Sequence, residues 1–127
     1  MAEKPLRPDP IAGLSNGDSV VLAAMQLAVW MGAGRIVLYG VDHTFRMPRD
    51  FQSHDQPVTD GGEENHFLTN YRSPGEKWWP PRLENIDRAF QAASDYFRRH
   101  GIEVANCTRG GKLEAFPRRD FDAELTH

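Results

Sequence analysis

The sequence predicts a small α/β domain built on a short parallel sheet. Residues 35–40, RIVLYG, form an apolar run without polar alternation, which is typical of a strand covered on both faces. Residues 102–107, IEVANC, read as a second short strand. Between them, residues 82–100 carry one apolar stripe at three- and four-residue steps, which predicts a helix. A strand–helix–strand crossover implies that the two strands are parallel.

The first element expected along the chain is a helix over residues 19–31. Residues 1–12 hold three prolines and read as an extended arm, and residues 13–19 are a cluster of turn formers that can cap the helix. The helix is apolar on nearly every face, so we expect it to be buried on two sides or covered by another subunit. A homo-oligomer follows as an expectation.

A long loop, residues 41–80, separates the first strand from the second helix. It contains four prolines, three glycines and three histidines, and no helical period runs through it. A loop of this length is usually functional or disordered, and its many aromatic residues argue against simple disorder. We therefore expect residues 13–127 to form one domain in which this loop lies over the carboxyl edge of the strands.

Composition limits the classes of function. The chain has 127 residues, a net charge of −3 and 26% charged residues, with no basic run longer than a pair, so neither a DNA-binding face nor an integral membrane protein is expected. The single cysteine, Cys107, excludes an internal disulfide. Because the first ten residues lack an apolar signal core, we expect a cytoplasmic protein.

The first candidate site follows the first strand. Ligands of open α/β sheets bind beyond the carboxyl ends of the strands, where Asp42 and His43 lie in this sequence. These side chains are suited to binding a ribose, holding a metal or acting as an acid–base pair. The alternative is that Asp42 caps the loop and His43 is a polar residue with a structural partner.

Two glycine-containing turns are candidates for binding a phosphate. Thr108, Gly110, Gly111 and Lys112 follow the second strand, where glycines admit a close ligand and a lysine neutralises charge. Before the first helix, the turn that includes Asn16 and Gly17 is placed to present backbone N–H groups at a helix N-terminus. An ordinary glycine turn and an ordinary N-cap turn are the structural alternatives.

The long loop offers a further histidine. His66, between Asn65 and Phe67, is either a general base or a packing residue of an ordered loop. The loop's histidines and acidic residues match no compact metal motif. A Mg²⁺ ion on Asp42, bridging the phosphates of a ligand, is favoured over a dedicated transition-metal site, and no tightly bound organic cofactor is expected.

Several segments together resemble a known family. They are SNGDSVVLAAMQLAVWMGAGRIVLYGVDHTF, NHFLTNY, KWWPP and VANCTRGGKLEAFPRRDFD, which span about residues 13–122. Their order and spacing resemble the hydroxymethylpterin pyrophosphokinase-like family, which includes flagellin-modifying and polysaccharide glycosyltransferase homologues. The pattern is more distantly similar to bacterial CMP-sialic-acid sialyltransferases. The resemblance covers the C-terminal half of such proteins only.

The resemblance implies a Rossmann-like, three-layer fold that binds a nucleotide or nucleotide-sugar. It adds weight to a set of site-lining residues, namely Ser15, Asn16, Gly17, Asp42, His43, Asn65, His66, Thr108 and Gly110. The leading expectation is a glycosyltransferase-like transferase using a CMP-activated sugar, with His66 or His43 as the base. The alternatives are Mg²⁺-dependent diphosphate transfer from ATP to a pterin alcohol, and a truncated non-catalytic module that binds a ligand or assembles with itself.

Overall fold

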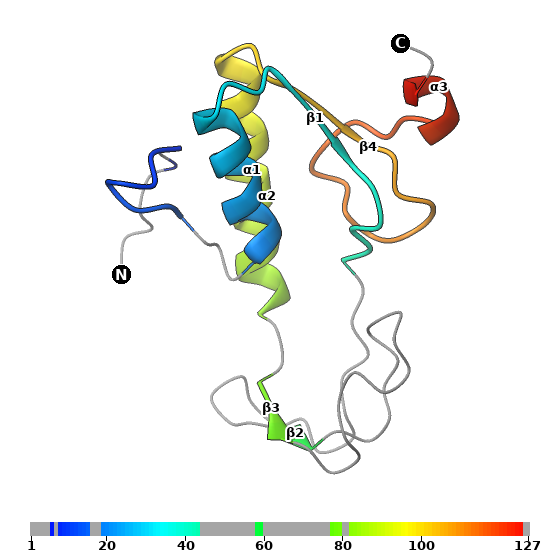
Figure 1. The fold of residues 1–127 in the computed structure, drawn as a ribbon. Helices are drawn as coiled ribbons and strands as arrows, with labels where there is room; N and C mark the ends of the chain where they lie inside the picture. Colours follow the sequence, from blue (N-terminus) through cyan, green and yellow to red (C-terminus); the bar gives the residue numbers. More distant parts are fainter. Residues whose placement is uncertain are drawn as a thin grey trace. The chain divides into compact units, whose positions relative to one another are not determined.

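The computed structural model describes residues 6, 8–15, 19–43, 58–59, 77–79 and 82–125. The chain divides into two compact units. The first comprises Met1–His43 and Leu83–His127 and contains the helices and the parallel strands (Figure 1). The second comprises Thr44–Arg82 and contains a short antiparallel pair, β2 (Val58–Thr59) and β3 (Lys77–Trp78).

The predicted strands and their parallel pairing are confirmed. Strand β1 (Arg35–Leu38) pairs with β4 (Glu103–Asn106) so that Arg35 lies opposite Glu103 and Leu38 opposite Asn106. Both strands are shorter than the sequence predicted. Gly40 follows β1 with a φ of 77°, a left-handed conformation that a strand cannot continue through and that glycine adopts without strain.

The predicted second helix is also confirmed. Helix α2 (Leu83–Arg99) packs on β4 through the apolar stripe formed by Ile86, Phe90, Ala93 and Phe97, all of which are buried. Its first turn carries an acidic residue and its last turn two arginines, the arrangement that complements the helix dipole. In the described part of the chain, no helix is long and apolar enough to cross a bilayer.

The first helix differs from its prediction. Helix α1 (Val20–Trp30) buries only one face, on which Leu22, Met25 and Gln26 lie. Its opposite face is apolar but exposed, so the expectation that this helix is buried on two sides is wrong. The other alternative, a cover supplied by another subunit, remains a prediction.

The second face of the sheet is in contact with the C-terminal part of the chain. Side chains alternate between the faces of a strand, so Ile36 and Leu38 join the helix-side core while Arg35 and Tyr39 point to the other face. There the ring of Tyr39 lies 4.5 Å from that of Phe121 in the short helix α3 (Phe121–Leu125), and Arg35 forms an ion pair with Glu124. Elements thus contact both faces of the parallel pair.

Candidate functional site

The loops that follow β1 and β4 meet at one edge of the sheet. Parallel strands end on the same side, and three hydrogen bonds join the two loops there. The amide of Cys107 donates to the Leu38 carbonyl (2.8 Å), and the amide of Val41 donates to Thr108 Oγ1 (3.1 Å). The amide of Lys112 donates to the Asp42 carbonyl (2.7 Å). Residues 67 or more positions apart in the sequence are thereby fixed side by side.

The closest approach between the loops requires a glycine. Gly111 has a φ of 75°, and a Cβ placed on it would lie 2.6 Å from the Asp42 carbonyl oxygen. No real side chain tolerates that distance. Gly110 also has a positive φ, of 73°, but a Cβ there would meet nothing within 4 Å. The sequence predicted that Gly110 and Gly111 allow a ligand to approach the backbone. In the structure, Gly111 instead allows the backbone of Asp42 to approach.

Asn106 and Arg118 hold the loop after β4 in shape. The fully buried Asn106 accepts a hydrogen bond from the Thr108 amide (3.1 Å) and donates one to the Leu113 carbonyl (2.9 Å). The guanidinium of Arg118 donates to the carbonyls of Thr108 and Gly111 at 3.1 and 3.2 Å, and to that of Gly110. Neither residue was predicted from the sequence.

His43 has close partners on α2. It has a φ of 52°, its Nε2 lies 2.6 Å from Asp87 Oδ1 on α2, and its ring meets that of Phe90 edge-on. Only 7% of its side chain is exposed. This geometry agrees with the structural alternative for His43, in which its side chain is a polar group with a structural partner. Asp87 itself was missed, because its pairing depends on how α2 packs against the loop.

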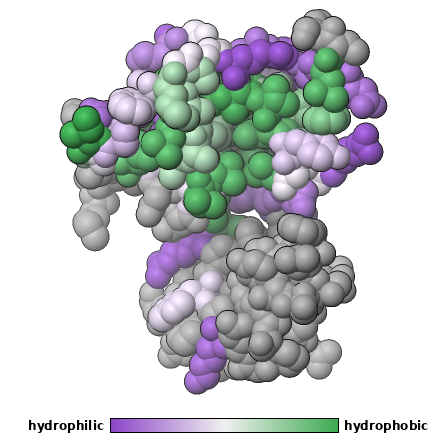
Figure 2. All heavy atoms as spheres, viewed as in Figure 1, coloured by the Kyte–Doolittle hydropathy of each residue, from purple (hydrophilic) through white to green (hydrophobic). Residues whose placement is uncertain are grey.

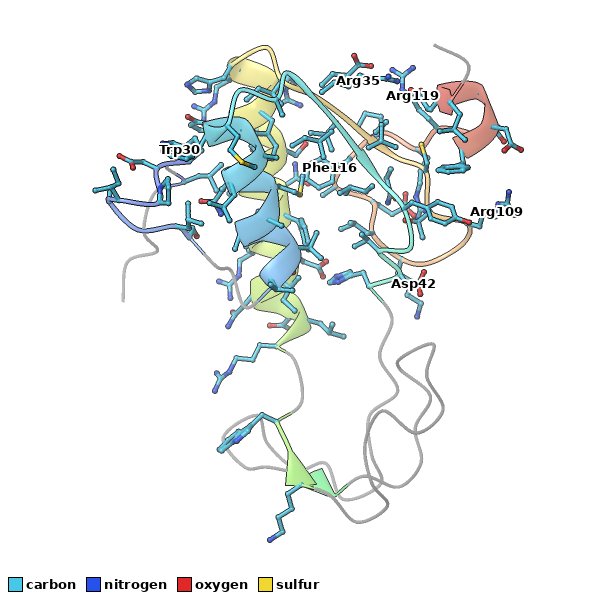
Figure 3. The ribbon with its side chains drawn as sticks, in the orientation of Figure 1. Trp30, Arg35, Asp42, Arg109, Phe116 and Arg119 are labelled. Atoms are coloured by element: carbon cyan, nitrogen blue, oxygen red, sulfur yellow. The ribbon has the colours of Figure 1, made fainter. Side chains whose placement is uncertain are left out.

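The residues of the two strand-end loops that face solvent include one carboxylate and two cations. Asp42, Arg109 and Lys112 are exposed, whereas Thr108 is buried with its hydroxyl turned to Val41. Figure 3 shows Asp42 and Arg109 at the same end of the sheet, opposite Arg35 and Arg119. Arg109 was not among the predicted residues, although it lies inside the turn TRGGK. Such a set is suited to an anion with polar hydroxyl groups.

The remaining predicted residues are not joined to this edge by the described contacts. The backbone of Ser15 both donates to and accepts from the side chain of Gln26, which ties the turn to α1. Asn16, Gly17, Asn65 and His66 lie outside the described residues. For these four the predicted roles remain predictions.

A separate cavity of about 340 Å³ opens at the beginning of β4. Its lining includes Phe97, Val104 and Phe116, with Glu103 and Arg119 among its charged residues. It lies at the other end of β4 from Thr108, and no residue predicted from the sequence lines it. The candidate site is therefore an open edge and not this cavity.

The expected Mg²⁺ ion would depend on Asp42. Within residues 19–43 and 82–125, and the shorter described segments, no three His, Cys, Asp or Glu side chains gather as a metal site. Mg²⁺ needs only one or two carboxylates where ligand phosphates complete its coordination, so the exposed Asp42 fits that mode of binding. Comparison of the chain with protein-family models, curated proteins and solved structures finds no match.

Proposed function

We propose that the edge formed by Asp42 and residues 108–112 binds a nucleotide or nucleotide-sugar. The observation that carries the proposal is the contact between the two strand-end loops, in which the Lys112 amide bonds the Asp42 carbonyl and Gly111 touches Asp42. This contact holds the backbone of Asp42 against the turn that carries Arg109 and Lys112, without requiring a ligand to bring them together. Preorganised groups bind with a smaller loss of conformational entropy.

The chemistry of each group suggests its partner on the ligand. Arg109 and Lys112 are placed to pair with phosphate oxygens, and a guanidinium does so through two parallel hydrogen bonds. Asp42 is suited to accept hydrogen bonds from ribose hydroxyls or to hold Mg²⁺ against the phosphates. Arg118 is occupied by the carbonyls of the loop, so its role is to position that loop.

For the whole chain we propose a nucleotide-dependent transferase of the glycosyltransferase type, with a CMP-activated sugar as donor and a Rossmann-like, three-layer fold. Contacts on both faces of the β1–β4 pair support the fold part of this proposal. Because Asp87 engages His43, we assign removal of the acceptor's proton to His66. The expected result is loss of turnover in His66→Ala and retained turnover in His43→Ala, provided that circular dichroism shows the His43→Ala variant to be folded.

A non-catalytic binding module is the second candidate, and the burial of His43 favours it. In this case the edge still binds a nucleotide, but no turnover depends on a histidine. Equal turnover in His66→Ala, His43→Ala and the unaltered chain would favour it over the transferase. Strict Mg²⁺ dependence with a preference for ATP would instead favour diphosphate transfer.

Calorimetric titration tests the binding proposal. The protein is titrated with CMP, CDP, ATP and a CMP-sugar, with and without Mg²⁺. We expect a cytidine nucleotide to bind, and Arg109→Ala to weaken that binding by about tenfold, the size of one lost charge-assisted hydrogen bond. Arg99→Ala is the matched control, because Arg99 is an exposed arginine at the last residue of α2. No heat of binding at millimolar concentrations of all four ligands would remove the proposal.

A further inference from the structure

In the first unit, the helix pair α1–α2 and the sheet β1–β4 both end on the same side of that unit. Figure 1 shows α1 lying in front of α2 and β1 in front of β4. The contacts agree, since α1 packs on α2 and β1 pairs with β4. Among the described residues β1 has no second strand beside it. The side formed by α1 and β1 is therefore an open end of a helix layer and of a sheet.

The backbone of β1 offers hydrogen bonds on that open side. The carbonyls of Gly34 and Leu38 accept from the amides of Glu103 and Cys107, so the even-numbered residues face β4. Successive residues of a strand point their N–H and C=O groups to opposite edges. The polar backbone groups of Arg35 and Val37 therefore point to the open edge, which is a template for another strand.

Helix α1 presents an apolar stripe to the same side. Val20 and Met31 are 82% and 74% exposed, and Leu27 between them is 37% exposed. With Ala24 they recur at steps of four, three and four residues, which places them on one line of the helix, opposite the buried Leu22. Figure 2 shows apolar side chains gathered over this face, from α1 across to β1.

We propose that a second copy of this chain covers this side, continuing both layers across a two-fold axis. Strand β1 would pair antiparallel with β1 of the second copy, with Val37 opposite Val37 and Arg35 opposite Tyr39. The two α1 helices would pack along their stripes. A sheet of order β4-β1-β1-β4 results, covered by helices in the order α2-α1-α1-α2.

The distribution of charged side chains on this side favours a second copy of the chain as the partner. In a two-fold contact each side chain near the axis meets its own counterpart, so a charged stripe would repel itself. Residues 19–34 contain no charged side chain. The only charge on β1, Arg35, lies off the axis in the Val37-centred register and is already paired with Glu124. Pairing centred on Arg35 would place two arginines opposite each other, which is unfavourable.

Analytical ultracentrifugation of the whole chain at micromolar concentration tests the proposal, and we expect the mass of two chains. Val37→Pro removes an outward N–H group while leaving the bonds from β1 to β4 in place, and it should weaken the dimer at least tenfold. Met31→Lys places a charge within the apolar contact with the second copy, and it should also weaken the dimer at least tenfold. Leu125→Lys is the matched control, because Leu125 is 66% exposed on α3 and lies outside the proposed contact.

Three results would overturn the proposal. They are a monomer for the unaltered chain, a dimer that survives both Val37→Pro and Met31→Lys, and a dimer lost equally in Leu125→Lys. Circular dichroism checks that each variant is folded. If Val37→Pro does not fold, Met31→Lys alone decides, since its side chain is exposed in the single chain and the substitution fills no buried space.

Discussion

At the scale of single residues, the candidate edge depends on buried or half-buried polar groups that fix backbone. Asn106 and Arg118 bond five backbone groups of the loop after β4, and Thr108 bonds the loop after β1. Thr108 was predicted from the sequence to contact a ligand, whereas in the structure its hydroxyl accepts a hydrogen bond from the Val41 amide. Asn106 looked like an ordinary strand residue, and Arg118 like half of a surface arginine pair, because their partners are carbonyls and amides that only the folded loop presents.

Replacing Gly111 by alanine tests the contact between the two loops. Gly110→Ala is the matched control, since both glycines have a positive φ that costs a side chain about 1–2 kcal/mol. Only at Gly111 does the added Cβ meet the Asp42 carbonyl. We expect Gly111→Ala to lose at least about 1 kcal/mol more free energy of unfolding than Gly110→Ala in urea titration. Equal losses would show that the loops are not in contact in solution.

Replacing Arg118 by alanine tests the framework of the loop. The guanidinium makes hydrogen bonds to several carbonyls, and each bond to a charged group is worth more than a neutral one. We expect a loss of about 2 kcal/mol in the free energy of unfolding. Arg98→Ala removes an exposed arginine whose partner is Asp95, three residues away on the same helix, and should cost under about 0.5 kcal/mol. A similar small loss for both variants would contradict the positioning role of Arg118.

At the scale of elements, local pattern predicted most of what the structure shows. Helix α2 and both strands agree with their predicted ranges to within two residues. The helix has a clear apolar period, the strands are short and largely apolar, and each element has a glycine close to one end. The parallel pairing followed from the crossover. The sequence pattern could not show which face of α1 is buried, because a helix that is apolar all round has no polar face to mark the side exposed to solvent. Helix α3 was missed because five residues are too few to show a period.

The buried glutamine of α1 makes a prediction about that element. Gln26 is fully buried and bonds both the amide and the carbonyl of Ser15. Gln26→Met keeps the volume but leaves both backbone groups without these partners, so we expect a loss of about 1–3 kcal/mol in the free energy of unfolding by urea titration. The neighbouring Leu27→Met, at a partly exposed position, should change it by less than about 0.5 kcal/mol. If the two variants are equally stable, Gln26 does not tie the turn to α1.

At the scale of the whole molecule, the first unit is a small α/β structure with two exposed surfaces that differ in chemical character. One is the strand-end edge, whose exposed groups are charged and suited to a phosphorylated ligand. The other is the α1–β1 side, whose exposed groups are apolar or backbone and suited to a second chain. The sequence predicted the first from the position of strand ends and hinted at the second through α1.

The edge itself is tested most directly by assigned amide NMR spectra of the ¹⁵N-labelled protein during titration with CMP. The account predicts that the amides of Asp42, His43 and residues 109–112 shift together and saturate with one dissociation constant. It also predicts that the amides around the cavity at Phe97 and Val104 do not shift. Saturating shifts confined to that cavity, or no shifts at millimolar CMP, would contradict the claim that the contact between the two loops forms a nucleotide site.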